Sequence, residues 1–367
     1  MRINLSRLFI MLLAILFAAK APAADETAAW FHPNAKQLDV SESGPFAQLK
    51  DGTLVTVRGG DALLSRDKGR TWERHEISSE HQLKASPEIV VFVTREGTII
   101  VAILNLTQEK WGWNEKENRP VEGVQLPVWT ARSTDGGKTW TDVQQIQPDW
   151  CGAVRNMIQT KDGKLVLGAT HLKYPQPYHT SVTYVSQDDG RTWQRSEHID
   201  IGGRGHHDGI VEGTLLELKD GRLWYLLRTN RDALWQSFSD DGLTWSKAEP
   251  TDIGASSSPA QLLRLASGRI VLLWNRLAPE GKEVSFRRGA PFSDRQASWH
   301  REELSISFSD DDGQNWTQPV VLARNKARTD FSYPWILERQ PGQLWITTMF
   351  GGLKIRVMEE DFIARSE

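Results

Sequence analysis

The segment VSQDDGRTW, residues 185–193, recurs along the chain in close copies. Residues 65–72 read SRDKGRTW and residues 133–140 read STDGGKTW, so three segments share the pattern Ser-any-Asp-any-Gly-any-Thr-Trp. Residues 238–245 (FSDDGLTW) lack the first Ser, and residues 309–316 (SDDDGQNW) have Asn in place of Thr. The glycines of the five copies are 68, 53, 52 and 71 residues apart, and self-similarity at such a period predicts a repeat architecture.

A second signature, a strand pair joined at a Gly turn, occurs upstream of each copy and once more near the end of the chain. Its six occurrences are residues 50–57, 95–103, 161–169, 219–227, 266–274 and 340–348. Short alternating runs such as TYVS and SISFS precede the copies and are typical of strands. Helical periodicity is almost absent, and repeats of this length with about four short strands are typical of propeller blades. The sequence therefore predicts an all-β fold, a six-bladed β-propeller with four-stranded antiparallel blades.

The residue types of the repeated pattern suit a tight turn between strands. Asp and Ser or Thr side chains hydrogen-bond the turn backbone, Gly permits a positive φ, and Trp fills the gap between neighbouring sheets. We therefore predict that the repeated aspartates maintain the fold and take no part in catalysis. They are Asp67, Asp135, Asp188, Asp240 and Asp311.

The amino-terminal residues predict export. Arg2 and Arg7 precede an apolar run over residues 8–19, and the small residues APA follow at 21–23. This order is typical of a secretory signal peptide, and the run is too short to span a bilayer comfortably. We predict a signal peptide over residues 1–24, one propeller domain over residues 25–367, and a periplasmic or extracellular location.

Composition narrows the partners that the protein can have. The formal net charge is −3, which indicates no basic patch for nucleic acid or an anionic membrane. Cys151 is the only cysteine, so no intramolecular disulfide can form. No set of metal ligands at a sensible spacing is visible. We expect a soluble partner or substrate, and no cofactor or metal.

The repeated pattern resembles the Asp-boxes of the sialidase (neuraminidase) superfamily over roughly residues 40–355. The resemblance implies a secreted, exo-acting glycoside hydrolase on a six-bladed propeller, with a glycan or glycoconjugate as substrate. Sialidases use a Tyr nucleophile assisted by a Glu, and three arginines hold the carboxylate of the sugar. Because that carboxylate sits on the reacting carbon, it would repel an anionic nucleophile, whereas a phenol approaches uncharged and needs a base beside it.

Positions that can face the axial funnel follow from the Gly turns. The innermost strand of each blade should begin eight residues before the position that precedes the turn Gly. This step gives Ser43, Glu88, Val154, Glu212, Pro259 and Tyr333.

Four residues match the sialidase machinery in order and approximate spacing. Tyr333, in DFSYPWILERQPGQL, resembles the nucleophile, and Glu212, in VEGTLLELKDGRL, resembles its base. Arg228, in WYLLRTN, and Arg301, in WHREELSISFSDDDG, resemble two of the three arginines. An Arg fork suits a carboxylate because it can donate two parallel hydrogen bonds.

The chain departs from the family at the first arginine. Sialidases begin the first blade with Phe-Arg-Ile-Pro, and here residues 43–46 read SGPF. The Glu that holds this arginine in the family is also replaced, because residues 348–350 read TMF. The paired loss indicates a remodelled site, since a buried Glu without its Arg would be costly. Sialic acid or another acidic sugar, such as a uronic acid, could therefore be the substrate.

Further candidates complete the predicted site. Asp61 is the nearest match to the acid/base aspartate of the family, and the cluster His206, His207 and Asp208 is the second candidate, because His at its usual pKa can shuttle protons. Two more cations could bind an anionic group of the substrate. They are Arg155, one residue beyond an inner-strand position, and Arg58, at the end of a strand of blade 1.

Two other functions remain open. A propeller enzyme of another class, such as a uronate lyase, would use His206 or His207 with Tyr333 to handle protons. A glycan-binding propeller without catalysis could keep the fold and lose the first arginine. Trp111, Trp113 and Trp129 either form a sugar-stacking platform or pack against the edge of blade 2.

Overall fold

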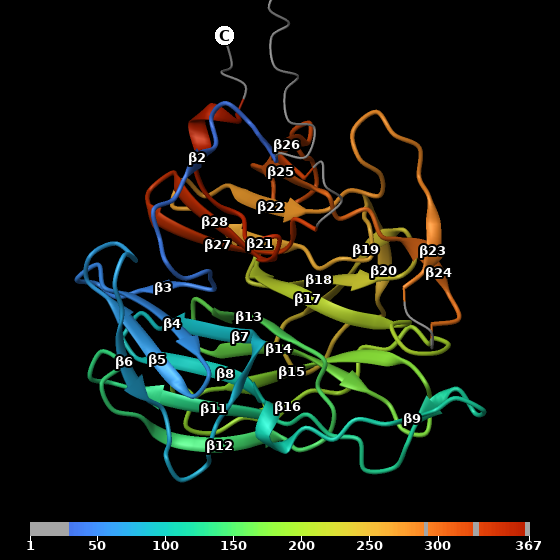
Figure 1. Ribbon diagram of the computed structural model, residues 1–367, viewed down its shortest axis with the longest axis horizontal. Coiled ribbons are helices and arrows are strands. Elements are labelled where there is room, and N and C mark those ends of the chain that lie inside the picture. Colours follow the sequence, from blue (N-terminus) through green and yellow to red (C-terminus); the bar gives the residue numbers. More distant parts are fainter. Residues whose placement is uncertain (1–28, 290–292, 326–329, 364–367) are drawn as a thin grey trace, which may run out of the picture.

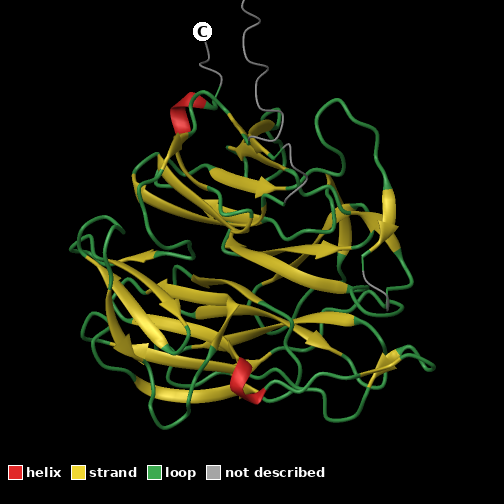
Figure 2. Cartoon of the chain, viewed as in Figure 1, coloured by secondary structure: helices red, strands yellow, loops and turns green. Residues whose placement is uncertain are grey.

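The computed structural model describes residues 29–289, 293–325 and 330–363. Apart from two short 3-10 helices, η1 (Leu106–Gln108) and η2 (Glu359–Asp361), these residues form strands and loops, as Figure 2 shows. None of the helices found there is long and apolar enough to cross a membrane. The predicted signal peptide lies outside the described residues.

Six antiparallel sheets follow one another along the chain (Figure 1). Blade 1 comprises β3 (Ala47–Gln48), β4 (Leu54–Arg58), β5 (Asp61–Ser65) and β6 (Glu73–Glu76). Blade 2 comprises β7 (Ala85–Val93), β8 (Ile99–Asn105), β11 (Val128–Ser133) and β12 (Thr141–Gln147). Blade 3 comprises β13 (Val154–Gln159), β14 (Leu165–Leu172), β15 (His179–Ser186) and β16 (Gln194–Arg195).

The second half of the chain builds the other three blades. Blade 4 comprises β17 (Ile210–Glu217), β18 (Leu223–Thr229), β19 (Ala233–Ser239) and β20 (Glu249–Gly254). Blade 5 comprises β21 (Gln261–Arg264), β22 (Ile270–Trp274), β25 (Glu303–Ser309) and β26 (Val320–Arg324). Blade 6 contains β27 (Ser332–Gln340), β28 (Gln343–Phe350) and β29 (Lys354–Met358).

Two amino-terminal strands complete the last two blades. β2 (Lys36–Gln37) pairs with β29 as the fourth strand of blade 6, and β1 (Trp30–Phe31) pairs with β26 as a fifth strand of blade 5. The start of the chain thereby closes the ring, and Figure 1 shows the blue sheet of blade 1 between the cyan strands of blade 2 and the red strands of blade 6. The predicted six-bladed propeller is confirmed, with one extra strand in blade 5.

Two hairpins lie outside the blades. β9 (Trp113–Asn114) pairs with β10 (Arg119–Pro120) within the connection from β8 to β11, and β23 (Phe286–Arg288) pairs with β24 (Gln296–Ser298) within the connection from β22 to β25. Both project at the right of Figure 1.

Apolar side chains fill the spaces between neighbouring blades. Between blades 5 and 6, Leu304, Ile306 and Phe308 pack with Ile346 and Ile355, and all five are at most 1% exposed. Every second residue of β25 points to this core, which is the period expected for a strand. Burial of each such side chain contributes about 1.5–3 kcal/mol to folding.

The predicted turn chemistry is present in both signatures. The six Gly turns join the innermost strand of each blade to the next strand, and their glycines have φ between +74° and +100°. In blade 3 the Ser186 hydroxyl donates to Asp188 Oδ1 at 2.8 Å, and Asp188 also accepts from the Thr192 backbone N–H (2.9 Å) and hydroxyl (2.7 Å). Asp67, Asp135, Asp188 and Asp311 therefore hold hairpin turns, as expected.

The aspartate predicted for the blade 4 copy of the pattern is wrong. In blade 4 the Ser239 hydroxyl donates to Asp241 Oδ1, which also accepts from the Thr244 backbone N–H at 2.7 Å. Asp241 therefore holds the turn, and Asp240 does not. Asp241 directly precedes Gly242, whereas one residue separates Asp from Gly in the other copies. The spacing of those copies therefore points to Asp240 instead.

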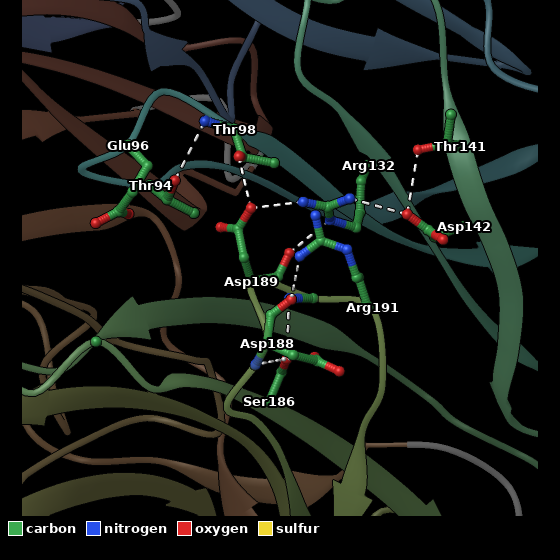
Figure 3. Close-up of polar contacts among 12 residues, drawn as sticks. Thr94, Glu96, Thr98, Arg132, Thr141, Asp142, Ser186, Asp188, Asp189 and Arg191 are labelled. Carbon is green, nitrogen blue, oxygen red and sulfur yellow. Dashed lines mark hydrogen bonds and ion pairs between the residues drawn. The ribbon is translucent and has the colours of Figure 1, made fainter.

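Figure 3 shows how such a turn also joins two blades. Arg132 of β11 donates to Asp189 Oδ2 at 2.5 Å and to Asp142 Oδ2 at 2.8 Å, and its side chain is 3% exposed. The Thr98 hydroxyl donates to the same Asp189 carboxylate at 2.7 Å. One arginine of blade 2 therefore clamps the turn of blade 3.

Candidate active site

Side chains from blades 4 and 6 meet at the inner strands of the propeller. The Tyr333 hydroxyl of β27 donates to Glu212 Oε1 of β17 at 3.1 Å. Arg228 Nη1 of β18 donates to the Tyr333 oxygen at 2.9 Å and to Glu212 Oε2 at 2.5 Å. Tyr333, Glu212 and Arg228 are 9%, 5% and 2% exposed. The structure therefore brings the predicted nucleophile, base and one predicted arginine into mutual contact.

Arg301 reaches the same place from the loop before β25. Its guanidinium lies 5.4 Å from the centre of the Tyr333 ring. Ser257 positions it relative to Arg228, because the Ser257 carbonyl accepts from Arg301 Nε (3.1 Å) and Nη2 while the Ser257 hydroxyl accepts from Arg228 Nε (3.2 Å) and Nη2 (2.9 Å). We call Tyr333, Glu212, Arg228 and Arg301 the Tyr333 cluster. Ser257 belongs to no recognisable motif, so sequence patterns do not predict it.

Irregular backbone aims these side chains. The pairing of β17 with β18 shifts register around Glu212, that of β13 with β14 around Arg155, and that of β7 with β8 around Glu88. Such β-bulges re-aim the side chains that they carry and are frequent next to active sites. Tyr333 has φ +61°, a left-handed conformation that is strained for an aromatic residue and persists where the surroundings enforce it.

The electrostatics of the cluster favour a protonated phenol. Burial raises the pKa of the Tyr333 hydroxyl, Glu212 adds to this effect, and Arg228 and Arg301 oppose it. Burial also opposes the charge of Arg228, but Glu212 and Tyr333 outweigh it and raise the pKa of this arginine. Burial lowers the pKa of Arg301. At neutral pH the nucleophile candidate is therefore uncharged and donates its proton to the carboxyl group that could remove it.

A buried ion pair lies between Tyr333 and the axial channel. Arg155 Nη1 is 3.2 Å from Glu88 Oε2, and the guanidinium lies 5.1 Å from the ring centres of both Tyr333 and Trp335. Arg155 and Trp335 line a cavity of about 550 Å³ between the inner strands. Arg155 thus contacts the cluster as a cation, but its side chain is only 1% exposed. Burial raises the pKa of Glu88 to about 7 despite Arg155.

Glu88 is a residue that the motif comparison missed. It is one of the six positions counted back from the Gly turns, and that count was the available signal for it. The resemblance to the family assigns it no role, so the predicted site does not include it.

Asp61 and Arg58 lie in blade 1 and have other partners. Asp61 pairs with Arg74 at 3.1 Å, and its side chain is 33% exposed. Arg58 pairs with Glu42 at 3.1 Å and donates to the carbonyl of Ser43. Within the part of the chain that the structure describes, neither forms a hydrogen bond or ion pair with the Tyr333 cluster.

His206 and His207 lie on the loop before β17. Their ring centres are 3.9 Å apart. Burial lowers the pKa of His206 to about 4 and, with the positive field of Arg228 and other neighbours, that of His207 to about 2. Both imidazoles are therefore neutral at neutral pH and stay neutral into the acidic range, whereas an ordinary imidazole gains its proton near pH 6.5.

Asp208 holds this loop in place. Its carboxylate accepts from the backbone N–H groups of Arg204 (2.8 Å) and Gly209 (2.7 Å), pairs with Arg295 at 3.3 Å, and is 1% exposed. Across residues 29–289, 293–325 and 330–363, no three His, Cys, Asp or Glu side chains are grouped as metal ligands would be.

A small cavity lies where the two segments that differ from the family pattern meet. A cavity of about 250 Å³ is lined by Ser43, Arg58, Pro87, Trp335 and Met349, among others. Ser43 and Met349 belong to the two segments that differ from the family pattern. The Arg58 side chain lines this cavity and donates to the carbonyls of Ser43 and Gly44, in the segment that differs.

Comparison with known proteins agrees with this architecture. The fold and the site define a six-bladed propeller of the sialidase superfamily. The chain belongs to the BNR repeat-like domain family, whose pattern matches residues 63–346. It is 27% identical over 313 residues to a sialidase of Micromonospora viridifaciens, and the match covers 78% of this chain and 45% of that protein.

Solved structures share the fold at lower identity. The Hadza microbial sialidase Hz136 matches with a TM-score of 0.57 and 18% identity, over 87% of this chain and 65% of that one. The α-L-arabinofuranosidase Arb93A from Fusarium graminearum matches with a TM-score of 0.54 and 12% identity, over 90% and 99%. At these identities the similarity shows the fold alone.

Proposed function

We propose that the protein is an exo-acting glycoside hydrolase that releases a terminal acidic sugar, sialic acid or a related one, from glycans. The contact of the Tyr333 hydroxyl with Glu212 at 3.1 Å and Arg228 at 2.9 Å carries the proposal. Membership of the BNR repeat-like domain family and the match to a sialidase support it. Because the chain spans less than half of that relative, the activity and the substrate are both part of the proposal.

The chemistry follows from the position of one proton. Tyr333 gives its hydroxyl proton to Glu212 as its oxygen forms a bond to the anomeric carbon, and the glycosidic bond breaks. The leaving oxygen takes a proton from an acid. Water then attacks the anomeric carbon, the bond to Tyr333 breaks, and the phenolate recovers its proton from Glu212 while the water proton passes to the acid/base.

The acid/base stays a choice between Asp61 and the histidine cluster. The ion pair of Asp61 with Arg74 is at the surface, so it can open at little cost. Asp208 is less suited, because two backbone N–H groups and Arg295 occupy its buried carboxylate. Neutral His206 or His207 could donate a hydrogen bond, but neither is an imidazolium at neutral pH.

The arginines suggest an acidic group on the substrate. Arg301 is the more available of the two clamp residues, since among the residues that the structure describes its Nη1 has only a distant contact, with Asp330 at 3.8 Å. Arg228 is already engaged by Glu212, Tyr333 and Ser257. A site with this reduced clamp suits a uronic acid as well as sialic acid. From the predicted signal peptide we propose a periplasmic or extracellular location for this activity.

Turnover of aryl glycosides by the purified protein tests the proposal. The panel contains an aryl α-sialoside, aryl uronides and an aryl α-L-arabinofuranoside, the last because of the likeness to Arb93A. We expect release of the aryl group from an acidic glycoside, and a loss of about 10³-fold or more in kcat with Tyr333→Phe, since the nucleophile is removed. Unchanged circular dichroism and Tm of the variant would exclude misfolding as the reason.

Other results would favour the two other functions. A product that absorbs in the ultraviolet, formed from a uronate polysaccharide without consumption of water, would indicate a lyase. Glycan binding that Tyr333→Phe leaves intact, with no turnover of any panel member, would indicate a binding propeller. Turnover of the arabinofuranoside alone would contradict the acidic-sugar specificity.

A further inference from the structure

An insertion in blade 2 extends over the loops of other blades. Residues 106–127 join β8 to β11 and contain the ribbon of β9 and β10. Asn118 Nδ2 donates to Asp294 Oδ2 of the blade 5 connection at 2.9 Å, and Arg119 Nη1 donates to the hydroxyl of Tyr174, in a blade 3 loop, at 3.0 Å. The ribbon is therefore held in place by two other blades.

A row of rings leads from the Tyr333 cluster to this ribbon. The Arg301 guanidinium lies 4.7 Å from the centre of the Trp299 ring. The centre of the Trp299 ring lies 6.3 Å from that of His207. The His207 and His206 centres are 3.9 Å apart, and His206 lies 5.0 Å from Trp111. All of these separations are in or close to the range of direct ring contact. Trp111 is 43% exposed, so the row ends at the solvent.

The row differs in charge from the floor of the site. Its two imidazoles are neutral at neutral pH because burial lowers their pKa values. The row therefore presents uncharged aromatic surface, whereas the cluster beside it carries Arg228 and Arg301. Such aromatic surface can pack against the C–H faces of pyranose rings, whose hydroxyl edges stay hydrated.

Simple packing of the insertion does not explain the exposed ring. The centre of the Trp111 ring lies 6.0 Å from that of Trp113 and 4.5 Å from that of Trp150, and a large part of the Trp111 side chain still faces solvent. The strained backbone of His207, with φ +66°, also indicates that the row is imposed by its surroundings.

We propose that Trp111, His206, His207 and Trp299 form a binding site for the uncharged sugar units on the leaving-group side of the scissile bond. The inference rests on the proposed function, because that function places the acidic sugar at Arg301 and so directs the rest of the glycan along the row. Three pieces of the structure carry it: the unbroken ring contacts, the exposed end at Trp111, and the anchoring of the ribbon by Asp294 and Tyr174.

The test uses uncharged disaccharides, which need neither the arginines nor turnover. Dissociation constants for lactose, cellobiose and mannobiose are measured by ligand-observed NMR with the wild-type protein and with Trp111→Ala. We expect at least one disaccharide to bind, and Trp111→Ala to weaken it about fivefold, the loss of one good aromatic contact. Trp30→Ala is the matched control, because Trp30 is 38% exposed and lies on β1 at the outer edge of blade 5.

Each outcome decides the inference separately from the proposed function. No binding of any of the three disaccharides, or equal affinity of wild type and Trp111→Ala, overturns it. Binding that depends on Trp111 supports it even if no aryl glycoside is turned over, in which case the proposed hydrolase alone fails.

Discussion

Tyr333 combines burial, backbone strain and four charged neighbours at a single residue. Its φ of +61° aims the phenol, and Phe350 packs edge-on against the ring at 5.0 Å. A tyrosine that merely filled space would need neither the strain nor a carboxyl partner. Strain of about 1–3 kcal/mol at one residue persists only when the surroundings over-determine it.

Arg301 should contribute to substrate binding through the geometry of its fork. Arg301→Lys keeps the charge but loses the second donor direction, so we expect kcat/KM on an acidic aryl glycoside to fall by about 30- to 100-fold, mainly through KM. Arg287→Lys is the control, because Arg287 also lies over Trp299, at 5.6 Å, but belongs to the exposed hairpin strand β23. Equal effects of the two changes would argue against Arg301 as a clamp.

Glu88 should make stability depend on pH. Its folded pKa of about 7 lies above the ordinary value of 4.5, so the stability it contributes is full below about pH 4.5 and is lost as the pH rises through 7. Glu88→Gln removes this titration. Between pH 4.5 and 7.5, wild type should lose about 3 kcal/mol relative to the variant in urea unfolding.

Glu88→Gln also leaves Arg155 without its carboxylate, which changes the free energy of unfolding at every pH. The informative quantity is therefore the slope of the free energy of unfolding against pH. Glu76→Gln, at an exposed position of β6, should give a curve parallel to wild type. A Glu88→Gln curve that is equally parallel would show that the folded carboxyl titrates normally.

At the scale of elements, the short-range signatures set the strand pairs and the turns. The Gly turns and the repeated Ser-any-Asp pattern both act within a few residues, so they could be recognised without knowledge of the fold. The misassigned Asp240 marks the limit of this reasoning, because only the observed hydrogen bonds of Asp241 reveal the shorter turn. The β-bulges at Glu88, Arg155 and Glu212 left no pattern in the sequence.

The junction of blades 2 and 3 should be sensitive to its arginine. Arg132→Met leaves the carboxylates of Asp142 and Asp189 without their shared partner, and we expect the free energy of unfolding to fall by about 2–3 kcal/mol in urea titrations. This loss of stability is smaller than the loss expected for a fully buried ion pair, because both carboxylates keep some contact with solvent. Arg191→Met, at an exposed position of the same turn (Figure 3), should change it by less than about 0.5 kcal/mol. Similar costs for both changes would contradict the role of Arg132.

The whole molecule is a ring whose closure depends on its amino-terminal strands. β2 supplies the outer strand of blade 6, and Phe31 of β1 packs against the core between blades 5 and 6. Without them, blade 6 has three strands and an exposed edge at β29.

Truncation tests this closure. A chain that begins at Leu38 should show a Tm lower by roughly 5 °C or more than a chain that begins at Asp25, measured by circular dichroism. The chain from Asp25 lacks only the predicted signal peptide and is the control. An unchanged Tm in the shorter chain would mean that β1 and β2 do not stabilise the ring.

The sequence alone determined the six repeats, the turns and the four residues of the Tyr333 cluster. Repeats and turns are local, and the cluster was found because its order along the chain resembles that of a known family. The tertiary structure decided which candidates meet. Tyr333 and Glu212 are 121 residues apart, and Ser257, which carries no motif, holds Arg228 and Arg301 beside them.

The tertiary structure also decided the charge states. Reference pKa values describe side chains in water, and only the folded protein sets the burial and the neighbours that shift them. His206 and His207 are neutral, and the pKa of Glu88 is near 7, because surrounding blades exclude water from them. The sequence predicts the order of the site residues, whereas the distances between them, their burial and their charge depend on the complete propeller.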